Sequence, residues 1–206
     1  MPVIVVANPK GGVGKSTLAT NIAGLYARQG HAVMLGDIDR QQSSRQWLAL
    51  RPAAAPRIEG WEVLGESTLK VPRGVTHVVL DTPAGLHDKK LDTMMRIAER
   101  VLIPLQPSLF DIQATHAFVN ALRAHKRGGD VELALVGMRV KEHTISNDQL
   151  HQFVATLKLP VLGYLRDTQN YVHVAARGLT LWDVTPSRVE RDLEQWQPLV
   201  KWLDRA

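Results

Sequence analysis

The sequence contains no cysteine, and this absence excludes several kinds of chemistry. Without thiols the chain forms no disulfide, no thiolate metal site and no cysteine-bound iron–sulfur cluster. The eight histidines are scattered and lack a metal-binding spacing such as His-x-x-x-His. No serine or cysteine pattern indicates a nucleophilic triad. Thiolate metal enzymes and covalent hydrolases are therefore not indicated.

Long apolar runs and blocks of like charge are missing as well. No run approaches the roughly 20 apolar residues that a membrane-spanning helix needs, and the first residues lack the basic segment of a secretory signal. We therefore expect a cytoplasmic protein. The net charge of +5 would draw the chain weakly to nucleic acid or an anionic membrane. Because Lys and Arg are dispersed among Asp and Glu, composition fits a solvated surface and a DNA-binding face about equally well.

The length of 206 residues suits one well-buried domain, which we expect to span residues 1–206. Apolar runs alternate with helical patterns, and this alternation predicts an α/β fold with a mainly parallel, twisted sheet covered by helices on both faces. The expected strands are 3–7, 32–37, 77–81, 101–104, 133–138 and 161–164. The expected helices are 16–29, 43–50, 89–99, 111–126, 147–157, 171–177 and 187–203. Two prolines make residues 51–57 a loop.

The most informative segment is a glycine-rich loop that follows the first strand and precedes a helix. Its three glycines let the backbone bend until several N–H groups face one anion. Lys15 would reach the β- and γ-phosphates of a nucleotide, and the Ser16 hydroxyl would bind Mg²⁺. The positive end of the helix dipole would add to the attraction. The predicted phosphate cradle consists of Gly11, Gly12, Val13, Gly14, Lys15, Ser16 and Thr17.

This loop departs from the common phosphate-binding pattern G-x-x-x-x-G-K-[ST] at its start. Pro9 stands in place of the first glycine, and a second lysine, Lys10, follows it. The run Lys-Gly-Gly-Val-Gly-Lys-Ser-Thr resembles the deviant Walker A motif of the ParA/MinD family of ATPases. The resemblance implies a P-loop NTPase domain with ATP and Mg²⁺ as cofactors. It also implies that Lys10 crosses a dimer interface and contacts phosphates of the other protomer, whereas a solvated loop lysine is the simpler interpretation.

Two further acidic positions follow strands. Asp37 and Asp39 lie two residues apart, so both face one side if the strand continues, and near a triphosphate such carboxylates orient water or hold magnesium hydration. The resemblance makes Asp39 the hydrolytic residue of switch I, although Arg40 replaces the proline common there. The alternative is an acidic pair that caps the next helix. Asp81 ends an apolar strand and would reach Mg²⁺ through water.

The segment after Asp81 resembles the switch II loop of the family. The resemblance implies that Pro83 and Gly85 lie at the nucleotide, where Gly85 could bring a backbone N–H to the γ-phosphate. Residues 103–111 resemble a turn of small ParA proteins that shapes the dimer face, and Asp111 fits equally well as a helix N-cap. Arg139 and Arg166 follow later strands, and we expect them at the adenine, because an arginine can stack on a base. A surface ion pair is the alternative for each.

The last predicted helix carries an apolar stripe that is typical of core packing. The stripe consists of Val189, Leu193, Trp196, Val200 and Leu203. MinD-type proteins end in an amphipathic membrane helix, but the opposite side here mixes acidic and basic residues, and Pro198 is expected to interrupt the helix. Three late arginines lie where ParA-type dimers bind DNA non-specifically, and plain solvated charges are the alternative. They are Arg177, Arg188 and Arg191.

The sequence as a whole favours a short ParA-like ATPase that is slow without a partner. ATP would close a homodimer, the dimer would bind non-specific DNA, and a ParB-like or cargo-adaptor protein would stimulate hydrolysis. Such a protein would associate with the nucleoid and segregate or position a plasmid, a chromosome or a protein assembly. The chain starts at the first strand, so we expect no additional DNA-reading domain. The alternatives are a MinD-like membrane-cycling ATPase and, with less support, a metabolic ligase on the same scaffold.

Overall fold

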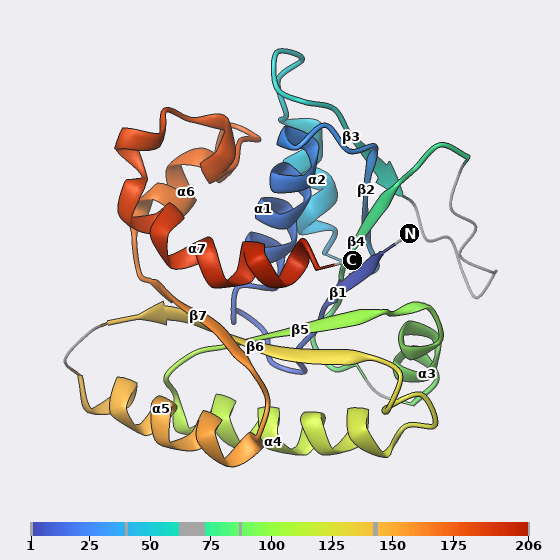
Figure 1. Ribbon diagram of the computed structural model, residues 1–206, viewed down its shortest axis with the longest axis vertical. Coiled ribbons are helices and arrows are strands. Elements are labelled where there is room, and N and C mark those ends of the chain that lie inside the picture. The colour runs from blue at the N-terminus through green and yellow to red at the C-terminus, as the bar shows by residue number, and fades with distance from the viewer. Residues whose placement is uncertain (1, 40, 62–72, 87, 142–143, 206) are drawn as a thin grey trace.

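The computed structural model describes residues 2–39, 41–61, 73–86, 88–141 and 144–205. Its strands form one sheet, drawn in Figure 1, in which every neighbouring pair is parallel. The order across the sheet is β3-β2-β4-β1-β5-β6-β7. In chain order the strands are β1 (Val3–Val6), β2 (Val33–Asp37), β3 (Ile58–Trp61), β4 (His77–Asp81), β5 (Arg100–Leu105), β6 (Glu132–Val140) and β7 (Val161–Arg166).

Helices cover both faces of this sheet (Figure 1). One face packs against α1, α2 and α7, and the other packs against α3, α4 and α5. The helices are α1 (Lys15–Arg28), α2 (Ser43–Ala49), α3 (Asp88–Ile97), α4 (Leu109–Ala124), α5 (Ile145–Leu157), α6 (Gln169–Ala175) and α7 (Glu190–Leu203), with 3-10 turns at Leu181–Asp183 and Pro186–Arg188. The predicted parallel α/β sheet with helices on both faces is confirmed.

The central strand explains why the apolar runs do not alternate with polar residues. All four residues of β1 are buried, because helices lie above and below them. The strands on either side, β4 and β5, are also almost completely buried. Since all carboxyl ends of parallel strands meet at one edge, Asp37 at the end of β2 lies in register with Asp81 at the end of β4. The fold therefore brings the predicted acidic residues to the loop that follows β1.

Three elements differ from the sequence-based expectation. Strand β3 was not predicted, because it has only four residues and Ile58 is the one that is fully buried. Helix α4 begins at Leu109 with Ser108 as its N-cap, so Asp111 is not the cap. The last helix begins at Glu190 and continues through Pro198, so the expected interruption was wrong. The loop predicted at residues 51–57 is confirmed.

The apolar stripe of α7 packs against the protein core, as predicted. Trp196 and Leu203 are buried, and Leu193 and Val200 are partly buried against the same cluster. At the C-terminus of the helix, the buried Arg100 side chain donates to the carbonyl oxygens of Trp202 (3.1 Å) and Leu203 (2.9 Å). The negative end of the helix dipole also attracts a cation at this position. The apolar face of α7 is therefore occupied within the chain.

Two histidine rings stack at the edge of the sheet opposite the carboxyl ends. The ring centroids of His31 and His77 lie 3.9 Å apart, and Tyr26 lies 4.4 Å from His77. The pKa of His77 is lowered to about 4 from its ordinary 6.5; burial is the largest cause and the neighbouring His31 acts in the same direction, whereas Asp204 raises it. The protonated form of His77 is therefore disfavoured in the folded protein.

This stacking predicts a pH-dependent stability. Between pH 6.5 and about 4 the unfolded chain binds a proton at His77 that the folded chain does not. The contribution of His77 to the free energy of unfolding therefore decreases as the pH is lowered through this range. Asp81, whose pKa is raised to about 6, acts in the opposite direction. Urea unfolding at pH 7, 6 and 5 should therefore be compared with His77→Phe, which keeps a ring but cannot titrate. A wild-type slope equal to that of the variant would contradict the prediction.

Candidate functional site

The glycine-rich loop after β1 is held in place by a buried asparagine. The Asn8 side chain donates to the carbonyl oxygen of Pro104 (2.8 Å) and to the Thr115 hydroxyl (3.0 Å), and its oxygen accepts from the Lys10 backbone N–H (2.9 Å). On the opposite side, the Gln106 side chain donates to the Gly12 carbonyl (2.8 Å). Neither Asn8 nor Gln106 was predicted as a site residue. The loop is therefore fixed before any ligand binds.

The backbone of this loop is shaped for an anion. Gly14 has φ of +94° and is the N-cap of α1, and a Cβ atom there would lie 2.8 Å from Met138 Cε. No side chain caps this helix, and its first turn contains no acidic residue. The first N–H groups of α1 are thus left to a ligand, and the helix dipole favours a negative one.

Lys15 lies at the centre of the cradle. Its side chain is buried and Nζ donates to the Lys10 carbonyl oxygen at 2.6 Å. Burial lowers the pKa of Lys15, whereas the charges of Asp81 and Asp39 raise it. Among the described residues the ammonium group has a hydrogen bond only to this neutral carbonyl, so it would gain from an anionic partner such as a phosphate.

Asp37 caps the helix that follows it. One oxygen of its buried carboxylate accepts from the N–H of Asp39 (3.0 Å), and the other accepts from Ser44 (2.8 Å) and Arg45 (3.2 Å) at the start of α2. The sequence left open whether the acidic pair caps the next helix, and in the structure Asp37 does so. The expected shared orientation with Asp39 does not follow from strand geometry, because β2 ends at Asp37.

Asp39 is half-buried, and its carboxylate accepts from the Gln41 N–H at 3.1 Å. It is near enough to Lys15 to raise the pKa of that lysine. Arg40, the departure from the usual switch I pattern, lies outside the described residues. Asp39 thus lies beside the cradle, and its second carboxylate oxygen has no hydrogen bond among the described residues.

Asp81 has one satisfied and one unsatisfied carboxylate oxygen. The fully buried Ser44 hydroxyl donates to Oδ2 at 2.7 Å, whereas the buried Oδ1 has no hydrogen-bond partner among the described residues. The pKa of Asp81 is raised to about 6; burial is the largest cause and the charge of Asp37 adds to it, whereas the hydroxyls of Ser16 and Ser44 and the charge of Lys15 act in the opposite direction. Ser44 was not predicted, since its contact with Asp81 spans 37 positions.

These oxygens fit a magnesium ion. An orphaned carboxylate oxygen on Asp81 and the nearby Ser16 hydroxyl are hard ligands of the kind that Mg²⁺ prefers. Within the described ranges there is no group of three His, Cys, Asp or Glu residues that could hold a metal ion. A magnesium ion here would therefore also need oxygens from water and from a bound nucleotide.

The segment after Asp81 is tied to the cradle. Gly85 donates its backbone N–H to the Pro9 carbonyl oxygen at 2.9 Å and has φ of +70°. The Thr82 hydroxyl donates to the Val6 carbonyl oxygen at 2.9 Å, and Pro83 is buried between them. The Gly85 N–H, expected at the γ-phosphate, is therefore engaged with the phosphate loop itself. It would have to leave Pro9 to reach a ligand.

A pocket of about 580 Å³ adjoins the cradle. Gly14 and Thr17 form one side, and the two predicted adenine residues, Arg139 and Arg166, lie on the other. The remaining members were not predicted as site residues, and most of them come from the short helix α6 or its ends, which carry no motif. The pocket is completed by Met138, Asp167, Thr168, Gln169, Tyr171, Val172, Ala175 and Ala176. Its size lies in the range of about 300–1,000 Å³ that is typical of small-molecule sites.

The two arginines in this pocket differ in how firmly their side chains are held. Arg166 donates to Asp192 at 2.5 Å, and Asp192 is completely buried although the sequence suggested a polar exposed position. The ion pair fixes the guanidinium, which favours its flat face as a wall of the pocket. Arg139 is exposed and adopts a left-handed backbone conformation with φ of +51° at a break in the pairing of β6 and β7.

The geometry agrees with the comparison to known proteins. Residues 4–181 match the CobQ/CobB/MinD/ParA nucleotide-binding domain. The chain belongs to this family. The matched region contains the cradle, both acidic strand ends and every residue that lines the pocket beside the cradle.

Curated relatives of this MinD/ParA protein include two positioning proteins. The maintenance of carboxysome distribution protein A of Gloeobacter kilaueensis is 34% identical over 116 residues, which cover 53% of this chain and 51% of the relative. The chain thus aligns with about half the length of that relative. The chromosome-partitioning ATPase Soj of Thermus thermophilus is 28% identical over 169 residues, covering 66% of this chain and 68% of Soj.

A solved ATP complex has the same fold. The McdA–ATP complex from Cyanothece superimposes with a TM-score of 0.72 and 13% identity, covering 97% of this chain and 96% of that one. The predicted P-loop NTPase fold is therefore confirmed. No helix in the described part of the chain is long and apolar enough to cross a membrane.

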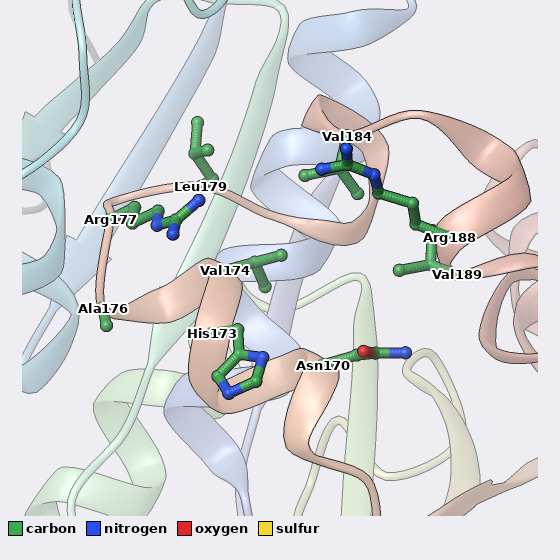
Figure 2. A pocket seen from close by; sticks show the side chains of 9 residues that line it. All are labelled: Asn170, His173, Val174, Ala176, Arg177, Leu179, Val184, Arg188 and Val189. Atoms are coloured by element: carbon green, nitrogen blue, oxygen red, sulfur yellow. The ribbon is translucent and has the colours of Figure 1, made fainter.

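Two of the three late arginines lie close together beside α6. All three are exposed. Arg177 and Arg188 line a single pocket, shown in Figure 2, and Arg191 lies in the first turn of α7. The structure therefore brings together two of the residues that were predicted separately from the sequence.

Proposed function

We propose that this chain is a ParA-like ATPase that closes into a sandwich dimer with ATP, binds DNA non-specifically and positions a cargo. The cargo class is a plasmid, a chromosome or a protein assembly, and a ParB-like or cargo-adaptor protein stimulates hydrolysis. The names of the relatives, chromosome partitioning and carboxysome distribution, support this class. Cytoplasmic, nucleoid-associated localisation follows from non-specific DNA binding.

The observation that carries the proposal is the environment of Lys10. Its backbone is held at both ends, by Asn8 at the N–H and by Lys15 at the carbonyl oxygen. Its ammonium group has no hydrogen bond or ion pair within the described residues, and the side chain is half-buried at the mouth of the cradle. Two such charges brought face to face repel each other unless a polyphosphate lies between them. ATP would therefore join two protomers that otherwise stay apart.

Hydrolysis would use few groups. The N–H groups at the start of α1 bind the phosphates, and Lys15 exchanges the Lys10 carbonyl for a phosphate oxygen. Asp39 orients the attacking water. Mg²⁺, held by Ser16 and through water by Asp81, would neutralise charge that develops on the phosphates. With a single carboxylate near the water, turnover is expected to be slow until a partner protein completes the site.

A MinD-like membrane cycle is not favoured by the C-terminal helix. Its apolar residues, including Trp196 and Trp202, are buried in the core and are not available to a bilayer. A membrane role would require α7 to detach, which would expose this face and leave Arg100 without its carbonyl partners. Liposome flotation with ATP would reveal such a cycle directly.

Binding to a DNA duplex of arbitrary sequence tests the proposal. We expect tight binding with ATP and weak binding with ADP, measured by fluorescence anisotropy. If the dimer presents Arg177, Arg188 and Arg191 twice, six phosphate contacts would lower the affinity about 10³-fold between roughly 50 and 200 mM salt. Equal binding with ATP and ADP, or affinity that salt leaves unchanged, would contradict the proposal.

A further inference from the structure

A second pocket, of about 450 Å³, lies on the other side of α6 from the pocket that adjoins the cradle. Ala176 lines both pockets, so a single turn of chain separates them. Figure 2 shows the second pocket between α6 and the chain that runs from Leu179 to Val189. Neither the phosphate cradle nor the acidic residues of the site reach it. It is therefore a separate recess whose occupant is not explained by nucleotide binding.

The pocket combines an apolar floor with a cationic rim. Val174 and Val189 are buried at its base, and the partly buried Leu179 and Val184 extend the apolar surface. The side chains of Arg177 and Arg188 approach from two different segments (Figure 2). Neither guanidinium has a hydrogen bond or ion pair among the described residues. Asn170, His173 and Ala176 complete the lining, which includes no acidic residue.

We propose that this pocket binds an acidic segment of a partner protein that inserts an apolar side chain between flanking carboxylates. Charge complementarity selects the acidic flanks, because two unpaired guanidinium groups favour carboxylates in bidentate geometry. The apolar floor selects the central side chain, since its burial is favourable. A DNA backbone, which the proposed function places on the same two arginines, satisfies only the first requirement, because phosphates and sugars leave the recessed valines uncovered.

The pocket wall is connected by hydrogen bonds to helix α2 and the loop that follows it. The Trp47 indole of α2 donates to the Leu179 carbonyl at 3.3 Å, and Arg51 donates to the Gly178 carbonyl at 3.1 Å. Arg51 also forms a buried ion pair with Asp183 at 2.9 Å. Helix α2 is capped by Asp37, next to Asp39. The identity of the bound segment as part of the hydrolysis-stimulating partner rests on the proposed function. The binding of an acidic segment to this pocket does not depend on it.

Methyl NMR of the full chain tests the pocket. The probe is a short peptide in which a leucine pair lies between glutamates, added to about 1 mM so that weak binding is detected. We expect shifts at the methyl groups of Val174, Leu179, Val184 and Val189. Arg177→Gln and Arg188→Gln should each weaken binding about tenfold. The charge-matched controls Lys158→Gln and Lys201→Gln, each at an exposed lysine elsewhere, should leave binding unchanged.

Three results would overturn this proposal. The first is the absence of methyl shifts at the highest peptide concentration. The second is equal binding when glycines replace the leucines, which would show that only charge matters. The third is a DNA duplex that shifts the floor methyls when the peptide does not, which would assign the recess to DNA. Loss of ATP-dependent DNA binding alone would contradict the proposed function and leave the peptide site standing. Thermal melting of each variant confirms that it is folded.

Discussion

Lys15→Ala is expected to abolish ATP binding at micromolar protein. The ammonium group is buried beside the phosphate cradle, where it donates a hydrogen bond to the neighbouring carbonyl oxygen of Lys10. Removing one member of a buried charge pair costs about 2–5 kcal/mol, which corresponds to a roughly 30- to 4,000-fold rise in Kd. Isothermal titration with ATP measures this change.

The fold should survive this substitution, because Lys15 starts a helix and alanine is a good helix former. Thermal melting checks that assumption. Lys201→Ala removes an exposed helical lysine far along the chain and is the matched control. An ATP Kd that rises less than threefold in Lys15→Ala would show that the cradle does not depend on this charge.

Lys10→Ala is expected to separate nucleotide binding from dimerisation. The loop should keep its shape, because Asn8 contacts the backbone N–H of residue 10 and Lys15 contacts its carbonyl oxygen. ATP binding should therefore change little. The dimer should be lost, since the ammonium group that would contact the second nucleotide is gone. Light scattering with ATP should give a monomer mass for the variant and a dimer mass for the wild type.

Asp39→Ala provides the opposite control. Without the carboxylate that orients water, ATP should persist and the dimer should accumulate. A Lys10→Ala variant that dimerises as well as Asp39→Ala would contradict the role of Lys10. A variant that loses ATP binding itself would place Lys10 at the nucleotide of its own protomer.

The parts of the site that the sequence predicts are those that depend on consecutive residues. The cradle is local, because Gly12 and Gly14 adopt positive φ and lead directly into α1. Asp81 is predictable because it ends a buried apolar strand, and parallel strands share one functional edge. The sheet was predictable for the same reason, except for β3, whose four residues place an exposed Glu59 and Gly60 between Ile58 and Trp61 and so form no apolar run.

The contacts that sequence reasoning missed link distant positions. Asn8 contacts Thr115 across 107 positions, and Ser44 contacts Asp81 across 37. Asp192 looks like a surface residue of an amphipathic helix, but it is buried against Arg166 and Asn170. Such polar pairs become visible only when the packing of α6 against α7 is known. Helical periodicity cannot distinguish a buried ion pair from a solvated charge.

A mixing experiment tests the assignment of Lys10 most directly. Lys15→Ala protomers cannot hold ATP but retain Lys10, whereas Lys10→Ala protomers hold ATP but lack the crossing charge. If Lys10 acts on the neighbouring protomer, a mixture contains one complete site per mixed dimer. Light scattering with ATP should then detect dimers in the mixture and monomers in each variant alone. Monomers in the mixture, at concentrations where the wild type is fully dimeric, would contradict a Lys10 that acts across the interface.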